Sequence, residues 1–169
     1  KFKSPLFTNR NLETIRHNEN PAFRSITLPM TFPVKTAPGS LKRALDRLCM
    51  SVEEKIDQGY SYIILSDRGA DRDNAPIPSL LACAGVHHYL IRTKKRTRIG
   101  LIIETAEARE VMHFALLFGY GASAVNPYGA FATINDLVKK EEIKNLRYMK
   151  AEDNYIKAVN KGLLKVLSK

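Results

Sequence analysis

Short runs of consecutive apolar residues alternate with amphipathic stretches through the middle of the chain. The runs lie at residues 62–65, 99–103 and 124–125, and each is followed by a polar turn and then by apolar residues at helical spacing. Strands that are apolar at consecutive positions are buried on both faces, which is typical of parallel sheets. The region between Tyr60 and Tyr128 therefore predicts three βα units with right-handed crossovers.

A fourth strand and helix precede this region. Residues 25–28 are expected to form the strand, and Pro29 is expected to end it. Apolar residues then recur at helical spacing between Ser40, as N-cap, and Gly59, as the stop signal. Later helices are expected at residues 79–91, about 106–118 and, in broken form, 131–138. Four βα units predict an α/β fold with a mainly parallel sheet, either a small open sheet or about half of an eight-stranded barrel.

The segments on either side of these units have a different character. Residues 1–38 are irregular and punctuated by prolines, with one short helix at residues 12–16, and are expected to drape over another surface. Residues 139–153 are predicted to form a charged linker without periodicity. An amphipathic helix is expected from about Asn154 to Leu167. Because that helix ends without a cap or a following element, we expect a truncated polypeptide.

Composition fits a globular protein with a core of its own. The 169 residues are 44% hydrophobic and 26% charged, which is typical of a single ordinary domain. No apolar run approaches the roughly 18 residues of a membrane span, and the N-terminus lacks a signal-peptide core. Cys49 and Cys83 have no CxxC partner and are expected to be buried thiols in a reducing compartment. These features predict a cytoplasmic location without a membrane partner.

The net charge of +10 raises nucleic acid as a partner. The basic residues are spread, however, between a cluster at residues 92–98 and the helical row Lys157, Lys161 and Lys165. Neither group is interleaved with aromatic residues that could stack on bases. A solvated face or a contact with an acidic neighbouring domain is therefore favoured, and a basic nucleic-acid-binding module stays an alternative.

Polar residues occupy the strand ends of consecutive units, where ligand sites of parallel α/β folds lie. They are Asp67, Glu104 and Asn126, and Arg68 follows on the first turn. One interpretation is a free-standing metal-dependent α/β enzyme that uses Asp67 and Glu104 as metal ligands or acid/base groups. The other, which we favour, is that these groups cap helix N-termini and pair with arginines.

Histidines and glycines complete no familiar site. His87 and His88 are adjacent on a predicted helix and point about 100° apart, so they cannot bind one ion as an HxxxH pair does. His113 belongs to another helix. The glycines form neither GxGxxG nor a phosphate-binding loop at a strand-to-helix turn. We therefore expect no metal site in this chain.

Several longer motifs, taken in order, resemble one known family. They are LSDRG at 65–69, APIPSLLA at 75–82, VHH at 86–88, ETAEARE at 104–110, HFALLFGYGA at 113–122 and VNPY at 125–128. Together they resemble the central domain of the glutamate synthase large subunit, which lies between a glutamine amidotransferase domain and an FMN-binding barrel. The resemblance covers essentially the whole chain. It implies that residues 1–150 are the central domain and that residues 151–169 begin the FMN-binding domain.

The resemblance also implies a reaction. Glutamate synthase releases ammonia from glutamine and channels it to 2-oxoglutarate, and the resulting imine is reduced by FMN, which receives electrons through an iron–sulfur cluster. FMN and the cluster are implied for the full-length enzyme, and no catalytic or cofactor-binding residue is implied for this chain. The isolated domain is expected to be inactive, with the amidotransferase and FMN domains of the same polypeptide or complex as its partners.

Two roles follow for such a central domain, which are to bridge the catalytic domains and to form part of the wall of the ammonia tunnel. A tunnel wall excludes bulk water and avoids charged groups that would trap the molecule as ammonium. Ser4, Thr8 and Asn9 are polar and uncharged and are our candidates for the tunnel entrance. Our candidates for contact with the FMN domain are Asp67, Arg68, Glu104, Asn126 and Tyr128. Because a half-barrel leaves apolar edges exposed, a homodimer of the isolated domain is a further expectation.

Overall fold

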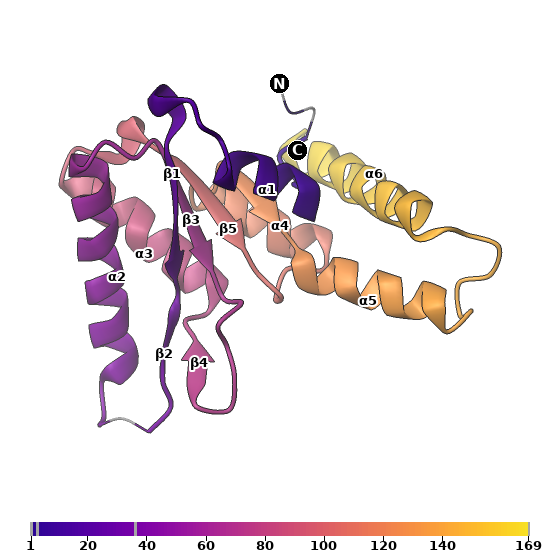
Figure 1. Ribbon diagram of the computed structural model, residues 1–169, viewed down its shortest axis with the longest axis horizontal. Coiled ribbons are helices and arrows are strands. Elements are labelled where there is room, and N and C mark those ends of the chain that lie inside the picture. The colour runs from indigo at the N-terminus through magenta and orange to yellow at the C-terminus, as the bar shows by residue number, and fades with distance from the viewer. Residues whose placement is uncertain (1, 3, 36, 169) are drawn as a thin grey trace.

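Four parallel strands form an open central sheet in the computed structural model, which describes residues 2, 4–35 and 37–168 (Figure 1). The strand order is β1-β3-β5-β6. The strands are β1 (Ser25–Pro29), β3 (Tyr62–Ser66), β5 (Gly100–Glu104) and β6 (Ala124–Asn126). The predicted α/β fold with a mainly parallel sheet is confirmed. The sheet is small and open, without barrel closure among the described strands.

The N-terminal segment extends this sheet beyond β6. Leu6 forms a parallel bridge with Val125. The amide of Phe7 donates to the carbonyl of Val125 at 2.8 Å, and the amide of Val125 donates to the carbonyl of Pro5 at 2.9 Å. The beginning of the chain therefore covers one edge of the sheet, and its backbone groups are paired instead of left open.

A second, two-stranded sheet was not expected from the sequence. It pairs β2 (Thr31–Pro33) with β4 (Asn74–Pro76) in antiparallel fashion and projects past the ends of the parallel strands (Figure 1). Prolines in both segments argue against strands, but β2 and β4 pair only with each other, and prolines are tolerated on such edges. Met30 connects the two sheets, since its amide donates to Ser66 and its carbonyl accepts from Ile77.

Six α-helices and two short 3₁₀ helices complete the described part of the fold. They are α1 (Asn9–Arg16), η1 (Pro21–Phe23), α2 (Ser40–Asp57), α3 (Ser79–Arg92), η2 (Arg96–Arg98), α4 (Val111–Gly119), α5 (Tyr128–Lys139) and α6 (Tyr148–Leu167).

The boundaries of five helices differ from the prediction. Helix α1 begins at Asn9 instead of at Leu12. The N-cap of α2 is Gly39, not Ser40; Gly39 has a φ of 80°, which glycine adopts readily. Helix α4 begins at Val111 instead of near Ala106, because the amide of Ala106 is bound by a side chain from another turn. Helix α5 is unbroken. Helix α6 begins six residues before Asn154, inside the predicted linker.

The two faces of the sheet are covered unequally. Helices α2, α3 and α4 pack on one face, against alternate strand residues such as Leu65 and Ile103, in the larger core. Helix α1 covers the other face through Leu12 and Ile15, which meet Ile64 and Ile102. Consecutive strand residues thus enter different cores, which explains the unbroken apolar runs in the sequence.

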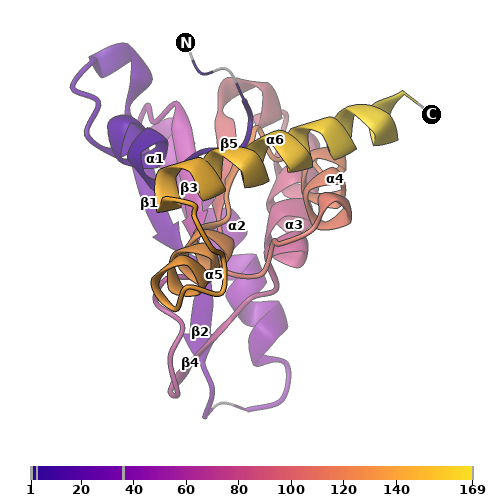
Figure 2. The same ribbon diagram turned by 90° about the vertical axis from the view of Figure 1, so that its right-hand side faces the viewer.

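Helix α6 lies across α4 and α5 on the far side from α2 (Figures 1 and 2). The ring of Tyr155 contacts both neighbouring helices, with centroids 6.5 Å from Phe114 and 6.1 Å from Phe131. Its hydroxyl donates to the carbonyl of Arg109 at 2.8 Å. The end of the chain is therefore attached to the core through aromatic edge-to-face contacts.

Both cysteines are free and buried, as expected. Burial raises the pKa of Cys83 to about 12 and also raises the pKa of Cys49, so both thiols stay protonated near neutral pH. Among the described residues, we find no helix with the length and apolar character needed to cross a bilayer.

We expect Phe114→Ala to lower the free energy of unfolding by about 3–5 kcal/mol, because the ring is fully buried between the sheet and α6. The matched control is Met112→Ala on the same helix, whose side chain is 55% exposed, with an expected change within about 0.5 kcal/mol. Urea denaturation of the two variants measures both values. Similar losses in the two proteins would show that α4 does not pack as described.

Candidate functional site

Polar residues that follow the strands meet at the carboxyl edge of the sheet. The register places Ser66 beside Glu104 and Glu104 beside Asn126. Asp67 and Arg68 follow β3 directly, and Tyr128 opens α5 after β6. The structure thus brings together the five residues that the sequence nominated for contact with another domain, and we call this group with Arg16 and Thr105 the strand-end cluster.

Glu104 is the centre of the strand-end cluster and is fully buried. Its carboxylate accepts hydrogen bonds from Nη2 of Arg16, on α1, and from Nε of Arg68. Burial by itself would raise the pKa of Glu104, but hydrogen bonds from Ser66, Arg68 and Arg16 hold the pKa below its usual value of 4.5. Glu104 is therefore a buried anion between two cations, and it joins α1 to the sheet.

Asp67 is also buried, and its partners are neutral. The hydroxyl of Thr105 donates to Oδ2 at 2.7 Å, and the amide of Ala106 donates to the same oxygen at 3.0 Å. Burial, followed by a hydrogen bond to Asp67, raises the pKa of Tyr128 above its usual value of 10.0. Asp67 therefore fixes the loop after β5 and the first residue of α5 in one place.

Asn126 connects the strand-end cluster to the N-terminal segment. Its Nδ2 donates to the carbonyl of Phe7 at 2.9 Å and to Oδ1 of Asn9 at 3.0 Å. Its own Oδ1 is buried and has no hydrogen-bond partner in the described part of the chain. An orphaned buried acceptor is uncommon in folded proteins, so this oxygen is available to a small donor.

The three candidates for the tunnel entrance have different neighbours. Thr8 is the N-cap of α1; its Oγ1 accepts from the amide of Asn11 at 3.1 Å, and Oδ1 of Asn11 accepts from the amide of Thr8. Asn9 borders the strand-end cluster through Asn126. Ser4 instead exchanges hydrogen bonds with Asn160 of α6, at 3.0 and 3.1 Å. The structure therefore groups Thr8 and Asn9 and places Ser4 against α6.

Only part of the strand-end cluster is open to a neighbouring domain. Asp67, Glu104 and Asn126 are buried. The side chain of Arg68 is 45% exposed, and its guanidinium lies over the ring of Tyr128 at 3.9 Å from the centroid. Of the five predicted contact residues, Arg68 and Tyr128 with their cation–π contact are therefore the two that a partner would meet first.

The carboxylates of the strand-end cluster are engaged within the chain. Both carboxylates already accept hydrogen bonds from side chains or backbone of the same chain. Within residues 2, 4–35 and 37–168, no three His, Cys, Asp or Glu side chains come together as a metal site would require. The favoured interpretation is confirmed for Glu104, which pairs with two arginines, but Asp67 binds Thr105 and the amide of Ala106 instead. The predicted capping of helix N-termini is wrong, because the N-caps of α3, α4 and α5 are Pro78, Glu110 and Pro127.

Sequence reasoning missed Arg16 and Thr105. Arg16 lies 88 positions from Glu104, and in the sequence it is only a basic residue in the last turn of a short helix. Thr105 follows Glu104 directly, so its closeness to Asp67 could have been inferred from adjacent parallel strands. No local signal marks Arg16, because its partner is brought to it only by the packing of α1 on the sheet.

We expect Glu104→Gln to lower the free energy of unfolding by about 2–3 kcal/mol, because two arginines lose their charged acceptor. The expected loss of unfolding free energy is smaller than for a fully buried ion pair, because Arg68 is partly exposed to solvent. The control is Glu13→Gln, which removes a surface partner of Arg16, with a change of at most about 1 kcal/mol.

The same two variants also test how the contribution of Glu104 to stability depends on pH. A carboxyl whose pKa is lowered in the folded state contributes its full stability above its ordinary pKa of 4.5, and this contribution declines as the pH falls through the folded-state value. The difference between the native protein and Glu104→Gln should therefore shrink on acidification to about pH 3, as followed by urea denaturation. A difference that is constant with pH would contradict an ionised Glu104.

Comparison with known proteins agrees with the resemblance found in the sequence. The family model described as "Glutamate synthase central domain" matches residues 1–169. The chain is 33% identical over its whole length to "Glutamate synthase [NADH]" of Schizosaccharomyces pombe and 36% identical over its whole length to "Glutamate synthase [NADPH] large chain" of Bacillus subtilis. It is also 36% identical, over 99% of its length, to "Ferredoxin-dependent glutamate synthase 2, chloroplastic" of Arabidopsis thaliana.

The matched region is a small part of each relative. It spans 8% of the Schizosaccharomyces pombe protein and 11% of the Bacillus subtilis and Arabidopsis thaliana proteins. The matches to the Schizosaccharomyces pombe and Bacillus subtilis proteins cover this whole chain, so they include every segment that builds the strand-end cluster. The chain therefore belongs to the glutamate synthase central domain family.

Proposed function

We propose that this chain is the non-catalytic bridging domain of a glutamate synthase and contributes to the wall of its ammonia tunnel. The observation that carries the proposal is the hydrogen bonding of Asp67 and Glu104, because both carboxylates accept from groups of the same chain. Groups bonded in this way hold structure and leave no free acid or base for a substrate. The small share of each relative that the chain spans supports a role as one module of a larger protein.

The reaction of the whole protein is part of the proposal. Glutamine would release ammonia in one module, and 2-oxoglutarate would accept it in another and be reduced to glutamate. The names of the relatives give NADH, NADPH and ferredoxin as electron donors for those proteins. A reducing compartment such as the cytoplasm is consistent with the two free thiols of this chain.

The residues of this chain do not fit the cofactors that such a reaction uses. An iron–sulfur cluster is held by four cysteine thiolates in common ferredoxin-type sites, and the chain has two cysteines, both buried. At the start of α5, where a flavin phosphate would approach a helix N-terminus, a Cβ added to Gly129 would lie 2.7 Å from the backbone of Ala106. That space is filled, so FMN and the cluster are assigned to other modules.

The proposed division of the chain follows the resemblance. Residues 1–150 would form the central domain and residues 151–169 the beginning of the FMN-binding domain. Because α6 begins at Tyr148, the boundary lies in the first turn of this helix. The packing of Tyr155 on Phe114 and Phe131 would then join the two domains rigidly.

The tunnel proposal is supported by the chemistry around Asn9. Neutral ammonia needs neutral donors and acceptors along its path, and Asn9, Asn126 and the carbonyl of Phe7 are neutral. The free Oδ1 of Asn126 is an acceptor that an N–H group can meet. Arg16 of α1 keeps its proton, because a guanidinium is not deprotonated in proteins, so it does not convert ammonia to ammonium.

The contact with the FMN domain is proposed for Arg68 and Tyr128. Arginine and tyrosine are enriched in the cores of protein interfaces, where planar groups bury area at low entropic cost. The buried members Asp67, Glu104 and Asn126 would act by holding this pair in place. The contact therefore depends on the whole strand-end cluster.

We expect Thr8→Val combined with Asn9→Leu to uncouple the two half-reactions of the complete glutamate synthase. Apolar groups at the entrance would let ammonia escape, so more than one glutamine should be hydrolysed for each 2-oxoglutarate consumed. The measurement is the ratio of glutamine consumed to 2-oxoglutarate consumed, together with free ammonia in solution.

The matched control is Asn11→Ala, which removes the other half of the capping box of α1 and leaves Thr8 and Asn9 in place. It should weaken the helix by about 1 kcal/mol and keep the ratio at one. A ratio of one in the double variant would refute the tunnel role. A raised ratio in the control would show that the effect comes from loss of the helix cap.

A further inference from the structure

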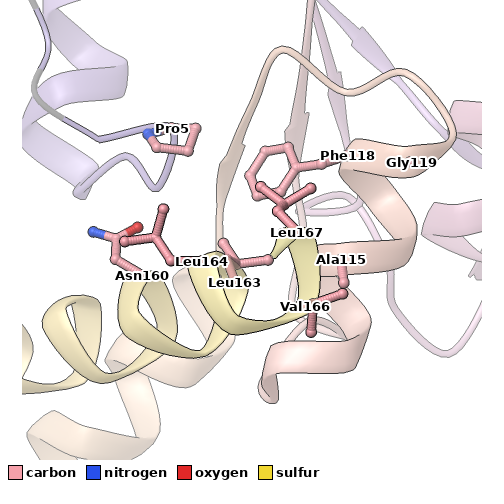
Figure 3. A pocket seen from close by; sticks show the side chains of 9 residues that line it. All are labelled: Pro5, Ala115, Phe118, Gly119, Asn160, Leu163, Leu164, Val166 and Leu167. Atoms are coloured by element: carbon pink, nitrogen blue, oxygen red, sulfur yellow. The ribbon is translucent and has the colours of Figure 1, made fainter. Parts of the chain in front are cut away.

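An apolar groove lies between the C-terminal halves of α4 and α6 (Figure 3). Its volume is about 490 Å³. Residues from both helices and from the N-terminal segment line it, namely Pro5, Ala115, Phe118, Asn160, Leu164 and Leu167, with Gly119, Leu163 and Val166. The groove is built by other elements than those that carry the strand-end cluster.

Large apolar side chains at this groove are left open to solvent. Leu163 is buried, but Leu164 is 69% exposed and Leu167 is 80% exposed. Figure 3 shows Leu164, Leu167 and Phe118 around one hollow, with Pro5 on its opposite side. A contiguous apolar patch of this kind on a folded domain marks an interaction surface.

The occupant of the groove is not a small polar metabolite. Small-molecule sites carry a few convergent polar groups that fix orientation. Among the lining residues only Asn160 has a polar side chain, and its amide is engaged with Ser4 in both directions. A groove between two helices with an apolar lining instead suits the apolar ridge of a third helix.

The lysines next to the groove indicate which charged residues the docked third helix would carry beside its apolar ridge. Lys157, Lys161 and Lys165 follow one another at i, i+4 spacing, in a row beside Leu164. Lys157 is paired with Asp153 at 2.7 Å. In the described part of the chain, the ammonium groups of Lys161 and Lys165 have neither an ion-pair partner nor a hydrogen-bond partner. Two unpaired cations along an apolar groove are complementary to carboxylates at the edge of an apolar ridge.

We propose that the groove between α4 and α6 docks an amphipathic helix with acidic residues along one edge, supplied by a part of the same polypeptide outside residues 1–169. The source of the helix rests on the proposed function, because a central domain of glutamate synthase is one module of a longer chain. The apolar ridge covers Leu164 and Leu167, and its carboxylates meet Lys161 and Lys165.

The test is lysine acetylation in the complete polypeptide, read by peptide mass spectrometry. A docked lysine is acetylated only when the helix dissociates, so Lys161 should react at least about tenfold more slowly than the exposed Lys42 of α2 if the groove is occupied about nine-tenths of the time. Leu164→Asp should restore the reactivity of Lys161 to that of Lys42, because its charge repels the acidic helix. The matched control is Met149→Asp, at an 81% exposed position of the same helix, which should leave Lys161 protected.

Zero-length carbodiimide coupling identifies the partner in the same sample. The expected product joins Lys161 or Lys165 to an Asp or Glu of a segment beyond residues 1–169 of the same molecule. Reactivity of Lys161 equal to that of Lys42, protection unchanged by Leu164→Asp, or coupling only to a second copy of the protein would each overturn the proposal. None of these readouts uses glutamate formation, so they are separate from the test of the tunnel.

Discussion

The fold depends on one buried charge. Glu104 sits at the end of a central strand without solvent contact, and an isolated carboxylate there would be strongly unfavourable. Arg16 and Arg68 compensate it from two sides, and their hydrogen bonds keep it ionised. Because Arg16 belongs to α1, this requirement fixes the helix on the face of the sheet that the other helices do not cover. The position of the N-terminal segment thus follows from the need to neutralise a residue 88 positions away.

The apolar pattern was sufficient to predict the parallel sheet. The strands at residues 62–65 and 99–103 are buried on both faces, and their continuous apolar runs are distinctive for that reason. Strands β2 and β4 were missed because each has three residues and carries proline. The start of α4 was misplaced because Ala106 continues a helical pattern in the sequence, while its amide is taken by Asp67 in the fold. Local pattern therefore failed where a tertiary hydrogen bond decided the conformation.

The strand-end cluster could be predicted as a group but not as a set of bonds. Parallel strands place the residues after each strand at the same edge, so Asp67, Glu104 and Asn126 were expected to be neighbours. Which cation neutralises Glu104 depends on the packing of α1, and no periodicity encodes that contact. Family membership came from long motifs in a fixed order, since the charges and spacing alone were also compatible with a metal-dependent enzyme.

The pairing of Leu6 with Val125 has a consequence for damaged forms of the protein. Cleavage by a protease after Phe7 would release residues 4–7 from the sheet and leave the N–H and C=O groups of Val125 without their bonds to Pro5 and Phe7. An uncovered strand of this kind recruits strands from other molecules and is a starting point for fibrous aggregates. Residues 4–7 thus protect this sheet edge against polymerisation, so an intact edge segment is a condition for the protein to remain dispersed at high concentration.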